Sequence, residues 1–269
     1  MFGDIIRFNK LFSNEEKVVV VAVDHGEFSG PIPGLIDLPK TVESVKEAEA
    51  ILMSPGMVAH CLDTFSRRDS PRLILRLNWS SSYCFQWNYN DSLAADVISP
   101  QEALYLGADL GMASLILKTE AERVDTENVA NFAKIIREKR RCGLPIIGEY
   151  YPCNMDKLTP EDLHQQVYIA CRIISELGAD AIKTFYTGEK FSEIVEATPI
   201  PILTLGAEKM EKESQALQLA YKAVNAGAKG VVFGRNVFQA KNPEIFLKAL
   251  KKVVKEGRDP KIVSEEFDL

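Results

Sequence analysis

Cysteine is scarce in this sequence, and long apolar runs are missing. Five cysteines are spread over 269 residues without a Cys-x-x-Cys pair. This argues against a disulfide framework or a structural zinc site and is typical of a reducing compartment. No apolar run approaches the roughly 20 residues of a membrane-spanning helix, and the first residues lack the basic-then-apolar layout of a signal peptide. We therefore expect a cytoplasmic protein that has no membrane partner.

Positive charge is also in deficit. The 32 Lys and Arg residues are outnumbered by 38 Asp and Glu residues, which gives a net charge of −6. Such a chain has no overall positive field to attract nucleic acid. Any anionic ligand must therefore be held by local groups.

Short runs rich in β-branched residues alternate with longer stretches of helical period, the pattern of βα units around a parallel sheet. Eight such runs are present, at 18–24, 57–62, 72–78, 112–117, 145–151, 181–186, 201–204 and 230–233. Eight strands close a barrel, so we expect a single α/β domain over residues 1–269 with the (β/α)8 TIM-barrel fold. A doubly wound open sheet is the competing architecture. The weakest connection is 63–71, which leaves little room for a helix between the second and third strands.

Residues that typically begin or end helices lie between the runs and support this layout. Glycines at 107, 178 and 227 each follow a helical stretch and precede a strand, where glycine can end a helix in the left-handed conformation. Asn242-Pro243-Glu244 supplies an N-cap, a proline and an acid for a last helix that runs to Gly257.

Lys183 lies in an otherwise apolar run, where alternation places it on the same face as Ala181. If that face points into the barrel, desolvation favours the neutral amine, which is the nucleophilic form. The alternative is a lysine that extends to the barrel mouth and pairs with a carboxylate.

Other polar residues end neighbouring strands. Glu149 and Tyr151 share one face of the fifth run and Tyr150 takes the other. A tyrosine beside a lysine can transfer protons, although buried tyrosines usually pack with a satisfied hydroxyl. Asp24 and His25 end the first run, where they either bind substrate hydroxyls and relay a proton or form a turn.

Glycine turns follow the last two strands, where many barrels bind phosphate. Gly206 and Gly234 allow backbone N–H groups to approach an anion, and Lys209 and Arg235 are candidates to supply charge.

A catalytic metal is an alternative because His25 and His60 are expected at strand ends. Metal sites need three or four converging ligands, and the third histidine, His164, lies in a helical stretch. We therefore expect no metal, while a metal-dependent barrel enzyme stays open.

Several motifs in order make the sequence resemble archaeal-type class I fructose-bisphosphate aldolases and the related 2-amino-3,7-dideoxy-heptulosonate synthases. The motifs are Asp24-His25-Gly26 continuing through 29–35, Tyr151-Pro152, the segment 183–188 and the segment 234–239. The likeness covers nearly the whole chain.

The resemblance implies an imine on Lys183, proton transfer by Tyr151 and substrate orientation by Asp24. It also implies phosphate binding at Gly206, Gly234 and Arg235, a role for His60 at the end of the second strand, and a homo-oligomer such as a decamer.

Three departures from the family pattern are present. Cys153-Asn154 stands where relatives usually carry Arg-Gly, which removes a cation. Gly206-Ala207-Glu208-Lys209 stands in place of Gly-Gly-Pro-Lys and adds an acid, and Glu149 stands where the fructose-bisphosphate aldolases carry an aromatic residue.

The leading hypothesis is a metal-independent class I aldolase that needs no cofactor beyond the covalent lysine imine. Its substrate is expected to be a phosphorylated small molecule, a ketose phosphate, with fructose 1,6-bisphosphate as the default. Alternatives are an aldol transferase of the synthase type, a thiolase-like acyl transferase, and a non-catalytic sugar-phosphate binder on the same barrel.

Overall fold

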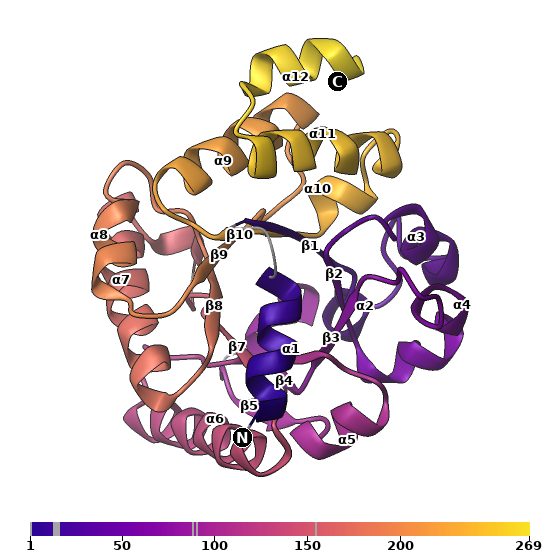
Figure 1. Cartoon of the computed structure of the whole chain (residues 1–269). Coiled ribbons are helices and arrows are strands. Elements are labelled where there is room, and N and C mark those ends of the chain that lie inside the picture. Colours follow the sequence, from indigo (N-terminus) through magenta and orange to yellow (C-terminus); the bar gives the residue numbers. More distant parts are fainter. Residues whose placement is uncertain (1, 13–16, 88, 90, 154) are drawn as a thin grey trace.

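Short β-branched segments form a closed barrel of parallel strands in the computed structural model, which describes residues 2–12, 17–87, 89, 91–153 and 155–269 (Figure 1). The barrel strands are β1 Val18–Ala22, β2 Ala50–Met53, β3 Arg72–Arg76, β6 Leu110–Ser114, β7 Ile146–Glu149, β8 Ala181–Thr184, β9 Ile202–Leu205 and β10 Gly230–Phe233. Their order around the barrel is β1-β10-β9-β8-β7-β6-β3-β2, and β2 pairs with β1 to close it. The predicted (β/α)8 barrel is confirmed, and the open-sheet alternative is excluded.

Helices surround the barrel, and α1 lies across one of its openings in Figure 1. The helices are α1 Phe2–Phe12, α2 Gly26–Ser29, α3 Leu38–Ser44, α4 Leu62–Phe65, α5 Pro100–Tyr105, α6 Glu122–Cys142, α7 Pro160–Leu177, α8 Phe191–Ala197, α9 Glu213–Asn225, α10 Arg235–Phe238, α11 Pro243–Glu256 and α12 Pro260–Phe267. The 3-10 turns in the described part of the chain are η1 Pro55–His60, η2 Ser81–Tyr83, η3 Phe85–Trp87 and η4 Met155–Lys157. Within the described ranges, no helix is both long and apolar enough to cross a membrane.

Two apolar cores follow from strand alternation. One face of each strand fills the barrel interior, and α1 adds Leu11 to that cluster with Phe8 and Phe12 packed against it. The opposite faces pack against the helices. Because Arg7 of α1 donates a hydrogen bond to the carbonyl of Gly143, just before β7, α1 covers the N-terminal end of the barrel. The C-terminal end is left for a site.

The predicted turn chemistry is confirmed. Gly107, Gly178 and Gly227 have φ values of 90°, 105° and 106°, which side chains disfavour. Asn242 caps α11 by accepting a hydrogen bond from the N–H of Ile245, and α11 ends at a left-handed Gly257.

The second predicted strand, 57–62, is wrong. The strand is the four-residue apolar run Ala50–Met53, and the residues after it form η1 and α4 instead. Pro55 lies two residues after the strand and begins the 3-10 turn, because its fixed φ suits a helical start and it has no N–H for a strand ladder. This shift also removes the crowding expected at 63–71, since the connection begins at residue 54.

A small hairpin extends the connection after β3. Its strands β4 Asn78–Ser80 and β5 Ala94–Asp96 pair antiparallel, and the segment between them contains η2 and η3. Asn78 anchors the hairpin to β6, because its side-chain amide donates to the carbonyl of Ser114 and accepts from the Ser114 N–H, both at 2.8 Å. This anchoring carries an aromatic segment to the C-terminal end of the barrel.

Candidate active site

A cavity of about 550 Å³ opens at the C-terminal ends of the barrel strands. Nine residues singled out in the sequence line it, namely Asp24, His25, Glu149, Tyr151, Lys183, Gly206, Lys209, Gly234 and Arg235. They come from β1, β7, β8, β9 and β10 or from the residues that directly follow these strands. The closed barrel therefore brings together groups that are up to 211 positions apart in the chain, from Asp24 to Arg235.

Lys183 projects into this cavity from β8. Ala181 lies in the barrel interior, and Lys183, two residues later, points to the same inner side of the strand. Thr184 points to the outer side, and its hydroxyl donates a hydrogen bond to the carbonyl of Tyr150. Lys183 is only 8% exposed, and its Nζ lies 2.5 Å from Oε1 of Glu149. The predicted strand phase is confirmed, but the ammonium is paired with a carboxylate rather than isolated.

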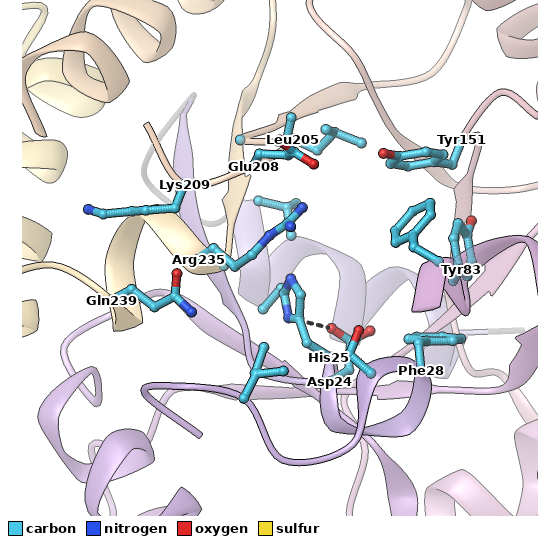
Figure 2. A pocket seen from close by; sticks show the side chains of 18 of the residues that line it. Asp24, His25, Phe28, Tyr83, Tyr151, Leu205, Glu208, Lys209, Arg235 and Gln239 are labelled. Carbon is cyan, nitrogen blue, oxygen red and sulfur yellow. Dashed lines mark ion pairs between the residues drawn. The ribbon is translucent and has the colours of Figure 1, made fainter. Parts of the chain in front are cut away.

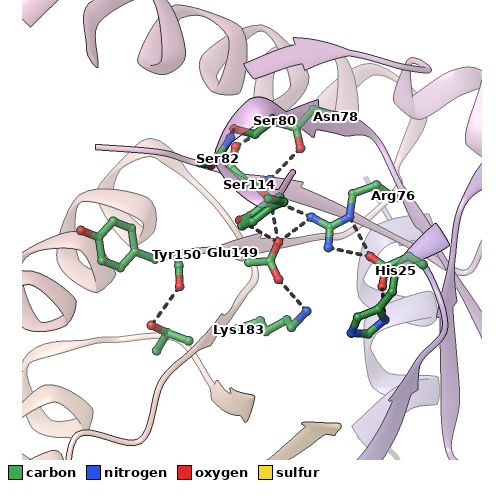
Figure 3. A network of polar contacts seen from close by, with 12 residues as sticks. His25, Arg76, Asn78, Ser80, Ser82, Ser114, Glu149, Tyr150 and Lys183 are labelled. Carbon is green, nitrogen blue, oxygen red and sulfur yellow. Dashed lines mark hydrogen bonds and ion pairs between the residues drawn. The ribbon is translucent and has the colours of Figure 1, made fainter. Parts of the chain in front are cut away.

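Glu149 is the centre of a buried hydrogen-bond network (Figure 3). Its second oxygen accepts hydrogen bonds from Arg76 Nη1 at 2.5 Å, from Ser114 Oγ at 2.7 Å and from the Tyr83 hydroxyl at 3.1 Å. Burial alone would raise the pKa of Glu149, but the charges of Arg76 and Lys183 outweigh it and hold the pKa below its ordinary range. Glu149 is therefore ionised at neutral pH.

Arg76 links Glu149 to Asp24. Its Nε and Nη2 donate to the same oxygen of Asp24 at 2.9 and 2.7 Å. Burial opposes ionisation of Asp24 as well, yet Arg76 and then Lys183 lower its pKa. The charges thus alternate in sign from Lys183 through Glu149 and Arg76 to Asp24, and the buried set is neutral overall.

His25 borders this network as a neutral ring. Burial lowers its pKa to about 4, despite the nearby Asp24 carboxylate. Its Nδ1 lies 3.7 Å from Asp24 Oδ1, which is too long for a hydrogen bond. The ring packs edge-on against Phe238, and a Cβ at Gly234 would collide with it. Gly234 is therefore required for the packing of His25, a reason that the sequence did not suggest.

Tyr151 sits among aromatic rings on the β7 side of the cavity. Its ring centroid lies 4.8 Å from Phe185, 5.5 Å from Tyr83 and 5.9 Å from Phe85. Tyr150 points the other way, into the outer core, and its hydroxyl donates to Gln166. The predicted opposition of the two tyrosines is confirmed.

Arg235 and Lys209 lie on the β9 and β10 side. Among the described residues, neither side chain is paired with a carboxylate, and Arg235 Nε is a buried donor that lacks a hydrogen-bond acceptor. Asn236 fixes the loop that carries Lys209, because its amide donates to the carbonyls of Gly206 and Glu208 and accepts from the Met210 N–H. The loop therefore presents Lys209 from a fixed backbone.

Comparison with known proteins agrees with this geometry. The model of the DeoC/LacD family aldolases matches residues 18–240. The chain belongs to this family. An uncharacterized aldolase of Saccharolobus solfataricus is 32% identical over 266 residues, which is 96% of this chain and 97% of the relative. A 3-hydroxy-5-phosphonooxypentane-2,4-dione thiolase of Klebsiella pneumoniae is 27% identical over 253 residues, 93% of this chain and 81% of the relative.

Solved structures of aldolases share the fold of this DeoC/LacD family member. An archaeal fructose 1,6-bisphosphate aldolase has a TM-score of 0.79 at 26% identity, covering 93% of this chain and 98% of that structure. Another structure of such an aldolase has its catalytic lysine covalently bound to the carbinolamine intermediate of the substrate. It has a TM-score of 0.78 at 25% identity and covers 93% of this chain and 99% of its own. The predicted family resemblance is confirmed.

His60 is the one predicted site residue that lies elsewhere. It ends η1, is exposed, and lines a separate cavity of about 610 Å³ with Glu27 and Trp79. Its expected place at the end of a barrel strand was wrong, because β2 ends at Met53 and the residues from Pro55 to His60 form a 3-10 turn. His25 and His60 line different cavities, so the two rings do not converge on one point as ligands of a shared metal would.

Sequence reasoning missed Arg76, Tyr83 and Ser114 as members of the site. Alternation along β3 contained a signal for Arg76, because Ile74 lies in the barrel interior and Arg76 shares its face. Ser114 shares the inward face of β6 with Met112 and is the register partner of Glu149, so alternation contained a signal for it as well. Tyr83 gave no comparable signal, because its role depends on how the hairpin docks onto β6.

Proposed function

We propose that the protein is a class I aldolase in which Lys183 forms an imine with a ketose phosphate. The observation that carries this proposal is the inward-facing Lys183 amine, 2.5 Å from the Glu149 carboxylate at the C-terminal end of a DeoC/LacD family barrel. A lysine in such a site forms a Schiff base with a carbonyl, and the protonated imine then accepts electrons when a neighbouring carbon–carbon bond breaks. This chemistry has no step that requires a metal.

The surrounding groups suit the proton transfers that imine chemistry requires. Glu149 is the nearest base to Lys183, so it accepts a proton from the ammonium when the substrate carbonyl arrives. It can return the proton to the carbinolamine hydroxyl, which leaves as water. Arg76, Ser114 and Tyr83 all donate to its other oxygen and so hold the carboxylate in place. Asp24, fixed by two hydrogen bonds from Arg76, is placed to orient a substrate hydroxyl.

Tyr151 is the proposed partner of the oxygen on the departing carbon. In the cleavage direction its phenolate oxygen accepts the proton of that alcohol, which makes Tyr151 a neutral phenol, while the C3–C4 bond breaks and an aldehyde leaves. In the condensation direction it returns the proton. Its place on the β7 side of Lys183, inside the cavity, supports this role.

A phosphate on the carbon next to the imine is proposed to bind at Gly206, Gly234, Arg235 and Lys209. The unpaired guanidinium donor of Arg235 supports this assignment, because a charged donor gains most from an anionic acceptor. Fructose 1,6-bisphosphate is the first substrate to assay, because the solved neighbours at 26% identity are aldolases of that sugar. The homo-oligomer expected from the family resemblance stays a prediction.

The experiment is inactivation by borohydride in the presence of dihydroxyacetone phosphate, after exhaustive treatment with EDTA. The proposal predicts loss of activity only when both reagents are present, with activity in EDTA alone unchanged. No turnover and no borohydride-trapped adduct, together with tight binding of the ketose phosphate, would leave only a sugar-phosphate binder. A thioester formed from coenzyme A and a phosphorylated dicarbonyl compound would instead favour the acyl-transfer chemistry named for the Klebsiella pneumoniae relative.

A further inference from the structure

The cavity around Lys183 has two chemically different sides (Figure 2). Arg235, Lys209 and Gln239 lie together on one side, and Tyr151, Tyr83 and Phe28 lie together on the other. Lys183 comes from β8, which lies between β9 on one hand and β7 on the other. A substrate held as an imine on Lys183 therefore extends toward both sides.

The cations that line the cavity are distributed unevenly. Among the residues that the structure describes, four cations line it, namely Arg76, Lys183, Lys209 and Arg235. Arg76 and Lys183 are buried and already paired with Asp24 and Glu149. Of these four, Lys209 and Arg235 are the ones left to bind a substrate phosphate. Lys209 follows β9 and Arg235 follows β10. The charge for one phosphate is thus on one side.

The opposite side is a continuous aromatic wall. The ring of Phe28 meets Tyr83 edge-on at 4.9 Å, and Tyr83 meets Tyr151 at 5.5 Å. Phe85 packs against Tyr151 with ring centroids 5.9 Å apart, lines the cavity and is 56% exposed. Gln86 adds an amide but no charge. Arg76 lies 5.3 Å from the Phe28 ring centroid, but its guanidinium already donates hydrogen bonds to the carboxylates of Asp24 and Glu149.

The aromatic character continues outward along the same segment. Trp87 and Tyr89 are 66% and 50% exposed and lie 5.9 Å apart. A doubly charged phosphate placed against this wall would lose its hydration without gaining an ionic partner, which is unfavourable. An apolar group would instead bury surface and gain free energy.

We propose that the aldehyde half of the substrate is uncharged and apolar, so that the enzyme acts on a ketose monophosphate whose only phosphate is on the imine side. This inference rests on the proposed aldolase function. In the condensation direction, the enamine carbon of the donor attacks the aldehyde carbon and forms the new bond. The aldehyde oxygen takes the Tyr151 proton, and water then hydrolyses the imine to release the product and restore the Lys183 amine.

The test is a set of condensations with dihydroxyacetone phosphate as the fixed donor and three aldehydes as acceptors. The aldehydes are phenylacetaldehyde, glyceraldehyde and glyceraldehyde 3-phosphate. We expect kcat/KM for phenylacetaldehyde to exceed that for glyceraldehyde 3-phosphate by about 10- to 100-fold, the range that apolar pocket contacts supply. Phe85→Lys places a cation on the wall and should raise kcat/KM for glyceraldehyde 3-phosphate about tenfold while lowering it for phenylacetaldehyde. Trp87→Lys adds the same charge to the same segment outside the cavity lining, so it should change neither value.

The outcomes separate the two levels of the proposal. Absence of a borohydride-trapped imine with dihydroxyacetone phosphate would overturn the aldolase function itself. A trapped imine with glyceraldehyde 3-phosphate as the best acceptor of the wild-type enzyme would overturn only the apolar acceptor. Equal effects of Phe85→Lys and Trp87→Lys would also overturn it, because the selectivity would then not come from the wall.

Discussion

The Nζ of Lys183 lies 2.5 Å from Oε1 of Glu149, and both side chains are buried at the same end of the barrel. The pair exists because Glu149 of β7 and Lys183 of β8 are register partners in adjacent parallel strands, both with the inward phase. Glu149 occupies a position where the resembled fructose-bisphosphate aldolases carry an aromatic residue. The base that we propose for imine formation is therefore positioned by the pairing of β7 with β8.

Replacement of this base gives the first prediction. Glu149→Gln keeps the size of the side chain but removes the proton acceptor, so imine formation should slow by about 100- to 10,000-fold, the usual contribution of a general acid or base. Rapid-quench trapping with borohydride measures the rate. Ser114→Ala is the matched control, since it removes one hydrogen bond to the same carboxylate and leaves the carboxylate in place. Imine formation at the wild-type rate in Glu149→Gln would contradict the assignment.

The two tyrosines at the end of β7 give the second prediction. Tyr151→Phe should leave imine trapping intact and slow turnover by about 100-fold, because it removes only the acid–base group at the departing oxygen. Tyr150→Phe should leave turnover unchanged, since that ring lies in the outer core and its hydroxyl serves Gln166. The measurement is steady-state cleavage beside single-turnover imine trapping. If Tyr150→Phe is the damaging change, the proton donor has been misassigned.

Arg235 gives the third prediction. Arg235→Gln should raise KM for dihydroxyacetone phosphate by about 10- to 100-fold, because it removes a charged hydrogen bond to phosphate. The effect on kcat should be smaller, since the reacting carbon is not touched. Arg123→Gln is the control, because Arg123 is a highly exposed residue of α6. An unchanged KM in Arg235→Gln would place the phosphate elsewhere.

Glu27 gives a prediction on stability. Its carboxylate is buried beside the second cavity, and burial raises its pKa to about 6 from an ordinary value of 4.5. Between these two pH values the unfolded chain has released the proton and the folded chain still holds it. Stability therefore falls as the pH rises through this window, by about 2 kcal/mol in total.

Glu27→Gln removes this titration. The free energy of unfolding of the variant minus that of the wild type should increase by about 2 kcal/mol from pH 4 to pH 8. Urea denaturation of both proteins at both pH values measures this difference. Glu265→Gln, at an exposed position in α12, should show no such pH-dependent gain. A gain at pH 8 no larger than at pH 4 would show that the Glu27 carboxylate is hydrated.

The residues that could be predicted from sequence are those governed by local rules. Alternation predicted that Lys183 points inward from its strand and that Glu149 and Tyr151 share one face of theirs. The alternation of strand and helix periods predicted the barrel. The second strand was missed because Ala50–Met53 has a single β-branched residue, Ile51, while the 57–62 run that resembled a strand follows a proline.

The rest of the site depends on contacts that no local rule encodes. Tyr83 reaches Glu149 only because the hairpin Asn78–Ser80 and Ala94–Asp96 is fixed to β6 through Asn78. The pairing of Arg76 with Asp24 spans 52 positions of sequence and passes over one barrel strand, β2. Such pairs follow from barrel closure, which sequence spacing does not specify.

The measurement that bears most directly on the Schiff-base function is identification of the residue that borohydride fixes to dihydroxyacetone phosphate. Peptide mass spectrometry of the reduced protein should find the mass of the reduced adduct on Lys183 alone, and Lys183→Arg should abolish both the adduct and turnover while remaining folded. An adduct on Lys209, or full aldolase activity in Lys183→Arg, would contradict the role proposed for the β8 lysine.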